Sequence, residues 1–121
     1  MRVLVCGGRE YRDRVVLFGA LDALDAKYPV TLVIHGAATG ADTLAGAWAK
    51  SRGKEVLDFP MDREHGDPHY EGRRRNARML HEGKPACVVA FPGNEGTAHM
   101  MRIARGAGLL VWEPAKEQEV P

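Results

Sequence analysis

Three glycine-containing turns hold most of the residues that suit ligand binding. They cover residues 7–11 (Gly-Gly-Arg-Glu-Tyr), residues 36–42 (Gly-Ala-Ala-Thr-Gly-Ala-Asp) and residues 92–97 (Pro-Gly-Asn-Glu-Gly-Thr). Glycine permits positive φ and lets a ligand approach the backbone. Each turn precedes a segment of helical periodicity, and the N–H groups that begin a helix attract anions such as phosphate. The turns indicate a site for a phosphorylated small molecule, but they match neither a P-loop nor a dinucleotide fingerprint.

A basic segment at residues 72–79 adds four guanidinium groups, those of Arg73, Arg74, Arg75 and Arg78. In a helix Arg75 and Arg78 share a face, and Arg74 lies beside Arg78. The guanidinium fork suits phosphate. The alternative is a solvated basic face, which we favour for Arg73 and Arg74.

Short β-branched runs alternate with longer segments of helical spacing, which is typical of βαβ units. The predicted strands cover residues 2–6, 31–35, 54–59, 86–91 and 109–112, and the predicted helices cover residues 14–28, 41–51, 71–82 and a last segment that ends near 106. Right-handed crossovers then predict an α/β, Rossmann-like three-layer fold with a five-stranded, mainly parallel sheet of order about 3-2-1-4-5. All three glycine turns fall on the carboxyl edge of this sheet. The ligand crevice is expected there, between the first and fourth strands, where the winding reverses.

The apolar spacing also predicts which side chains face the sheet. These are Leu17, Leu21, Leu24 and Tyr28 in the first helix, Ala41, Leu44, Ala45 and Trp48 in the second, Ala77 and Leu80 in the third, and Met100, Met101 and Ala104 in the fourth. Cys6 and Cys87 lie in strand-like runs and are expected to be buried, reduced thiols. The polar residues 60–70 have no clear period, which indicates a functional loop or lid.

Composition limits the classes of protein to consider. The chain has 121 residues, 45% of them hydrophobic and 27% charged, with 17 basic and 16 acidic side chains. This predicts one domain at residues 1–113 and a charged, frayed tail at residues 114–121. Apolar runs of only a few residues predict no membrane span, and a start without a signal sequence predicts a cytoplasmic protein. The balanced charge argues against a nonspecific DNA coat, so nucleic acid is not an expected partner, and only the arginines of residues 73–78 support a local nucleic-acid site.

No metal or other cofactor is expected. Four side chains in and near the polar loop are of ligating types, but their spacing fits no closed metal site: Asp62, His65, Asp67 and His69.

Four motifs together resemble a known family. Gly-Gly-Arg-Glu-Tyr at 7–11, His-Gly-Ala-Ala-Thr-Gly-Ala-Asp at 35–42, Arg-Asn-Ala-Arg-Met at 75–79 and Ala-Phe-Pro-Gly-Asn-Glu-Gly-Thr at 90–97 match, in order, the YspA-type, YpsA-related branch of the SLOG superfamily. The resemblance covers nearly the whole chain. It implies a Rossmann-like domain that binds a nucleotide or nucleotide-derived ligand, as a sensor or a processing domain. It also raises a homodimer as an option, with the exposed faces of the last two helices available for it.

The wider superfamily suggests an alternative function. It includes the LOG phosphoribohydrolases, which cleave the N-glycosidic bond of cytokinin nucleotides, and the DNA-processing protein DprA. Arg75 falls on the arginine of the LOG Arg-Lys-x-x-Met segment. The LOG glutamate falls on Met100, which exchanges no proton. An N-glycosidase acting on a nucleoside phosphate is therefore the alternative to a binding protein, and whether the chain is an enzyme stays open.

The expected ligand site combines the turns with the basic segment. Its residues are Gly7, Gly8, Arg9, Tyr11, Gly36, Ala37, Gly40, Asp42, Arg75, Asn76, Pro92, Gly93, Asn94, Glu95, Gly96 and Thr97. If the protein is an enzyme, Arg75 and Asp42 are its candidate catalytic residues, although an acid at Asp42 also suits the helix start. Arg9 is expected to clamp phosphate or pair with Asp42. Tyr11 is expected either to stack on a base or to pack on the first helix.

Overall fold

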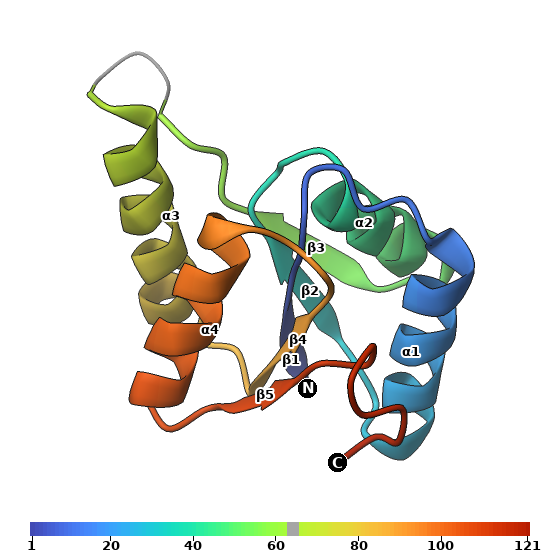
Figure 1. Cartoon of the computed structure of the whole chain (residues 1–121). Coiled ribbons are helices and arrows are strands. Elements are labelled where there is room, and N and C mark those ends of the chain that lie inside the picture. The colour runs from blue at the N-terminus through green and yellow to red at the C-terminus, as the bar shows by residue number, and fades with distance from the viewer. Residues whose placement is uncertain (63–65) are drawn as a thin grey trace.

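Five parallel strands form one sheet in the order β3-β2-β1-β4-β5, which confirms the predicted topology. The computed structural model describes residues 1–62 and 66–121 (Figure 1). The elements in chain order are β1 (Arg2–Cys6), α1 (Arg14–Lys27), β2 (Leu32–His35), α2 (Ala41–Ser51), β3 (Glu55–Asp58), α3 (Pro68–Gly83), β4 (Cys87–Ala90), α4 (Glu95–Gly106) and β5 (Leu110–Trp112).

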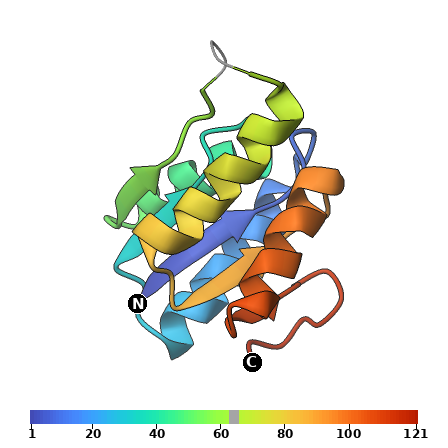
Figure 2. The same ribbon diagram turned by 90° about the vertical axis from the view of Figure 1, so that its left-hand side faces the viewer.

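The helices cover both faces of the sheet, α1 and α2 on one and α3 and α4 on the other (Figures 1 and 2). Successive residues of β1 point to opposite faces, so Val3 and Val5 join the core with α1 and α2 while Leu4 joins the core with α3 and α4. All three of these side chains are fully buried. The sheet is therefore the middle of three layers, and its carboxyl edge stays uncovered by the helices.

The stripe predicted for α1 is confirmed at Leu17, Leu21 and Leu24, which are buried, but not at Tyr28. Tyr28 follows the helix in an extended conformation, with 42% of its surface exposed. The reason is Pro29, because a residue that precedes proline is disfavoured in the helical region.

Helix α3 begins at Pro68, three residues before the predicted start, so residues 68–70 are helix and not loop. Asp67 caps it by accepting a hydrogen bond from His69 N at 2.9 Å, and proline suits the first helical position. The prediction that Ala77 faces inward is wrong: Ala77 is exposed, and the buried residues here are Asn76 and Met79, one position before Ala77 and Leu80. The reason is that α3 buries a polar side chain, which apolar periodicity does not detect. The remaining part of the expected lid includes residues 63–65, which lie outside the described residues.

The tail differs from the frayed segment that its charge predicts. Trp112 Nε1 donates to Glu117 O at 2.7 Å, and Lys27 Nζ donates to Val120 O at 3.3 Å. Val120 also packs against the core cluster of α1 and α2. These contacts return the tail toward the end of α1, as Figure 1 shows for the C-terminus.

Cys6 and Cys87 are both buried and unpaired with each other, as predicted, and burial raises the pKa of both thiols. Within residues 1–62 and 66–121, no helix has the length and apolar character needed to cross a bilayer.

Candidate functional site

The three glycine turns touch one another at the carboxyl edge of the sheet. Gly8 N donates to Pro92 O at 2.8 Å, which joins the β1–α1 turn to the β4–α4 turn. Gly8 O accepts from Ala41 N at 3.1 Å, which joins the same turn to the start of α2. The residues of the three motifs thus form one continuous edge, at the top of Figure 1.

Most of the turn glycines serve contact between the turns themselves. A Cβ on Gly8 would stand 3.0 Å from Pro92 O and 3.2 Å from Gly93 Cα. Gly40 has φ +76°, and a Cβ there would collide with the carbonyl groups of Gly8 and Arg9. Gly7 and Gly36 are similarly confined, by Ala41 and Arg75. The space that the sequence assigns to a ligand at these positions is therefore filled by neighbouring chain.

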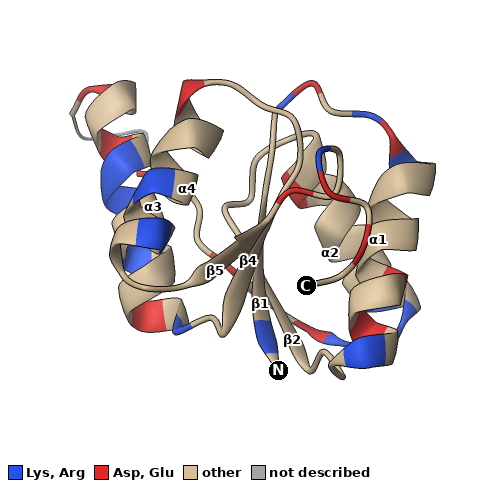
Figure 3. Cartoon of the chain, turned by 60° about the horizontal axis from the view of Figure 1, so that its bottom comes forward, with Lys and Arg blue, Asp and Glu red and all other residues tan. Residues whose placement is uncertain are grey.

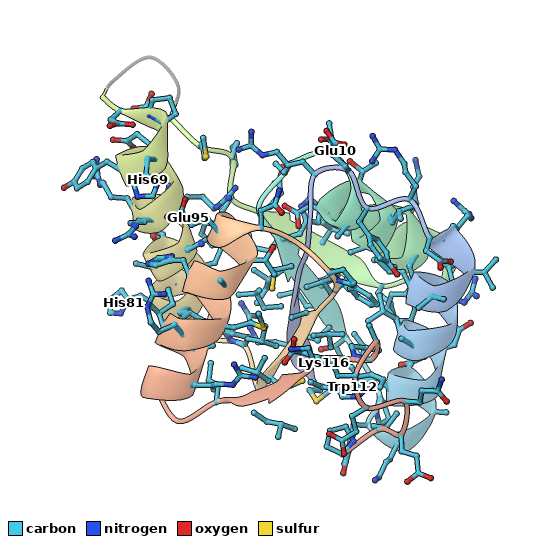
Figure 4. The ribbon with its side chains drawn as sticks, viewed as in Figure 1. Glu10, His69, His81, Glu95, Trp112 and Lys116 are labelled. Carbon is cyan, nitrogen blue, oxygen red and sulfur yellow. The ribbon has the colours of Figure 1, made fainter. Side chains whose placement is uncertain are left out.

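The first turn of α4 is the more open part of the edge. A Cβ on Gly96 would meet no atom within 4 Å. Asn94, Glu95 and Gly96 are exposed, and the side chain of Thr97 is buried beside Gly93. Neither α4 nor α2 has a side-chain cap on its first turn. Figure 4 shows Glu10 and Glu95 on this edge and Trp112 away from it. The backbone amides that begin α4 are therefore placed for an anion from solvent.

The buried side chain of Asp42 stabilises the β2–α2 turn by hydrogen bonds. Its Oδ2 accepts hydrogen bonds from Gly36 N at 3.1 Å and from Ala38 N at 3.2 Å, and only 7% of the residue is exposed. Burial raises the pKa of Asp42, and the bond from Ala38 and the charge of His35 oppose that rise. The acid lies in the first turn of α2, as expected, but its hydrogen bonds hold the turn before the helix, and α2 has no side-chain cap.

His35 ends β2 directly below the same turn. Its Nδ1 accepts from Ala37 N at 2.9 Å, and Ala37 itself has a positive φ of 58°. Burial lowers the pKa of His35, while the nearby carboxylates of Asp42 and Asp58 raise it. The neutral ring thus supports a turn whose backbone conformation is uncommon for alanine.

Arg75 reaches from α3 to the turn after β2. Its Nη1 donates to Gly36 O at 2.6 Å, and its Nε donates to Asn76 Oδ1 at 3.1 Å. Asn76 Nδ2 lies 3.2 Å from Gly96 O, to which it donates, and 3.1 Å from His99 Nδ1. Asn76 is 4% exposed, so its side chain fixes the orientation of Arg75 more than it offers itself to a ligand. Through this pair, α3 is tied to the first turn of α4.

Arg9 and Tyr11 take different positions. The Arg9 side chain extends across the edge until its Nη2 lies 3.9 Å from Met61 Sδ, in the connection after β3. The Tyr11 ring packs on Phe91, with ring centroids 5.4 Å apart. Of the two roles considered for Tyr11, the contact with Phe91 and the core cluster favours packing.

A cavity of about 220 Å³ opens beside Arg75, between α3 and the connection after β3, and not at the crevice expected between β1 and β4. Its described lining residues are Pro60, Asp62, Glu71, Arg74, Arg75 and Arg78. The sequence identified Arg75 but missed the others as lining residues. The available signal was the four-residue spacing of Arg74 and Arg78, which puts both on one face of a helix.

Two further predictions concern the position of the LOG glutamate and the binding of a metal ion. Met100, at the position of the LOG glutamate, is buried in the core on the α3 and α4 face of the sheet. No group of three or more His, Cys, Asp and Glu side chains gathers for a metal ion in the described part of the chain. His65, one of the four ligating residues considered, lies outside the described residues.

This geometry defines a Rossmann-like α/β domain whose loops meet at the carboxyl edge of a parallel sheet. A sequence profile of the YspA, cpYpsA-related SLOG family matches residues 1–66, and the chain belongs to that family. The Gene 61 protein of Mycobacterium phage D29 is 35% identical over 117 residues, which cover 91% of this chain and 93% of that protein.

Solved structures share the fold. The X-ray structure of TM1055 superposes with a TM-score of 0.70 at 23% identity, covering 92% of this chain and 72% of that one. The X-ray structure of DNA processing protein A (DprA) from Streptococcus pneumoniae superposes with a TM-score of 0.51 at 15% identity, covering 91% of this chain and 57% of that one.

Proposed function

We propose that the protein binds a nucleotide or nucleotide-derived ligand at the carboxyl edge of its sheet, with a phosphate group between the first turn of α4 and Arg75. Membership of the SLOG family supports nucleotide-related binding or processing in general terms. The particular ligand class and position are our proposal.

The fixed guanidinium of Arg75 carries this proposal. Arg75 is held by Gly36 O at 2.6 Å and by Asn76 Oδ1 at 3.1 Å, and Asn76 also bonds the first turn of α4. A cation and the start of a helix are thus tied together at one edge. Both groups favour a phosphate, the first through its planar fork of donors and the second through its backbone amides and dipole.

Asp42 and Met100, the two positions at which a catalytic acid was considered, fit binding without cleavage better. Asp42 directs its Oδ2 at two backbone amides of its own turn, and Met100 replaces the LOG glutamate in a buried position. Cleavage of an N-glycosidic bond needs a carboxylate that activates water or stabilises the sugar cation. We therefore expect chromatography to recover AMP intact after incubation with the protein.

Titration calorimetry with AMP tests the proposal. The wild-type chain is expected to bind AMP, and Arg75→Ala is expected to weaken binding by about tenfold or more, because a charge-assisted hydrogen bond contributes about 1.5–3 kcal/mol. Arg75→Lys is expected to recover only part of this loss, because lysine keeps the charge but not the fork.

Arg73→Ala is the matched control. Arg73 is exposed on the same helix and does not line the cavity, so this variant removes an equal charge from outside the cavity. Equal affinity for AMP in Arg75→Ala and the wild type, with both folded by circular dichroism, would contradict the assignment of Arg75.

A further inference from the structure

The cavity beside Arg75 has no part in the proposed contact with a single phosphate. It lies between α3 and the connection after β3 and has a volume of about 220 Å³. Among the residues that the structure describes, three guanidinium groups and two carboxylates line it, those of Arg74, Arg75, Arg78, Asp62 and Glu71. Basic groups therefore outnumber acidic ones in this described lining, which shares Arg75 with the proposed site.

Of the two described carboxylates in this cavity, that of Glu71 is shielded, whereas Asp62 is exposed. The side chain of Glu71 is only 8% exposed, and Arg74 Nη1 covers its Oε1 at 3.3 Å. The side chains of Arg74 and Arg78 are 59% and 52% exposed. A molecule that enters from solvent thus meets both guanidinium groups before it meets the carboxylate of Glu71.

Aromatic rings and ion pairs position these two arginines. The guanidinium of Arg74 lies 5.9 Å from the ring centre of Tyr70, and that of Arg78 lies 5.4 Å from the ring centre of Phe59. Arg78 Nε also contacts Glu82 Oε2 at 2.9 Å. Such contacts reduce the conformational freedom that a long side chain loses on binding, which favours a phosphate over a diffuse counterion.

We propose that this cavity is a second phosphate subsite, in which Arg74 and Arg78 hold a phosphoryl group joined to the one at the α4 edge, so that the protein prefers a nucleoside diphosphate to a monophosphate. The inference rests on the proposed function, because the first phosphate places the second. Arg75 connects the two subsites: its Nη1 bonds Gly36 O on one side, and its side chain lines the cavity on the other.

Calorimetry with AMP and ADP, in buffer free of divalent cations, tests this subsite. We expect the wild-type chain to bind ADP about tenfold more tightly than AMP, as one added charge-assisted contact predicts. In the double variant Arg74→Gln, Arg78→Gln we expect the two affinities to become about equal, with the AMP affinity unchanged. Arg73→Gln is the control on the same helix and is expected to keep the ADP preference.

The outcomes separate the two proposals. Three results would each overturn the second subsite and leave the first in place. The wild type could bind ADP and AMP with equal affinity, the double variant could keep the ADP preference, or Arg73→Gln could lose that preference to the same extent as the double variant. No binding of either nucleotide would overturn both. If the double variant fails to fold by circular dichroism, the single variants Arg74→Gln and Arg78→Gln are measured instead, and unchanged ADP preference in both would overturn the subsite.

Discussion

The carboxylate of Asp42 accepts hydrogen bonds from two backbone N–H groups in the turn before it. Loss of these bonds should lower the stability of the fold. In Asp42→Ala the buried Gly36 N and the partly buried Ala38 N lose their acceptor, so we expect the free energy of unfolding to fall by about 1–3 kcal/mol. In Asp42→Asn the amide oxygen can still accept, and the loss should be smaller. Urea denaturation measures both, with the exposed Asp58→Ala as the control expected to change little. Equal stability of Asp42→Ala and the wild type would contradict the claim that Asp42 stabilises the β2–α2 turn.

His35 predicts a pH dependence of stability. Burial lowers the pKa of its ring in the folded state, so the unfolded chain takes up a proton that the folded chain excludes. The free energy of unfolding should therefore decrease as pH falls below the ordinary histidine pKa of about 6.5 toward the lower folded value. In His35→Asn the side-chain oxygen can still accept from Ala37 N, but the free energy of unfolding should depend less steeply on pH. Denaturation at a series of pH values checks it, and the exposed His81→Asn should keep the wild-type slope.

The sequence identified candidate residues at the carboxyl edge but not the shape of the cavity beside them. Arg75 was identified from its motif, and it does reach the turn after β2. The cavity beside it was not predicted, because it depends on how α3 lies against the connection after β3. Glu71 shows the difficulty: a carboxylate in a polar segment gives no sequence signal that its side chain will be 8% exposed.

Two glycines in different elements should respond to alanine in opposite directions. Gly40 joins β2 to α2 with φ +76° and with the carbonyl of Gly8 where a Cβ would stand. Gly40→Ala should lower the free energy of unfolding by at least about 2 kcal/mol, because an alanine in this conformation is itself strained. Gly19 lies inside α1 with no atom within 4 Å of its Cβ position. Gly19→Ala should raise stability by about 0.5–1 kcal/mol.

Thermal and urea denaturation of both variants measures this contrast. A Gly40→Ala variant as stable as the wild type would mean that the turns at the carboxyl edge do not pack as closely as described.

At the scale of elements, the strands and all four helices were predictable, but the buried face of the polar helix α3 was not. In α1, Leu17, Leu21 and Leu24 follow the helical repeat and are buried. In α3 the buried positions include Glu71 and Asn76, whose burial depends on partners in α3 and α4. Local pattern detects which residues prefer the core, but it does not detect a polar group that is buried because a distant residue satisfies it.

The topology of the whole molecule was predictable from the sequence, but the packing of its C-terminal tail was not. Alternating strands and helices with right-handed crossovers leave few arrangements, and the sheet order follows from them. The charged tail was expected to fray, yet Trp112 Nε1 finds its acceptor at Glu117 O and Val120 packs on the core. Composition alone does not reveal such contacts.

Removal of residues 117–121 tests the structural role of the tail. It takes the acceptor from the buried Trp112 and uncovers the surface under Val120, so the free energy of unfolding should fall by about 1–3 kcal/mol. Lys116→Ala, which removes only an exposed charge of the tail, should change stability little. Unchanged stability after the truncation would contradict a structural role for residues 117–121.

Lys and Arg residues are prominent along α3 (Figure 3), and we propose a site where this helix meets the carboxyl edge. Titration of the 15N-labelled chain with AMP, followed by NMR, tests that location most directly. The account predicts amide shifts concentrated at Gly36, Gly96 and Thr97, together with the side-chain Nε signal of Arg75. Shifts concentrated instead at the opposite edge, around Leu110 and Trp112, or no shifts at all at saturating AMP, would contradict it.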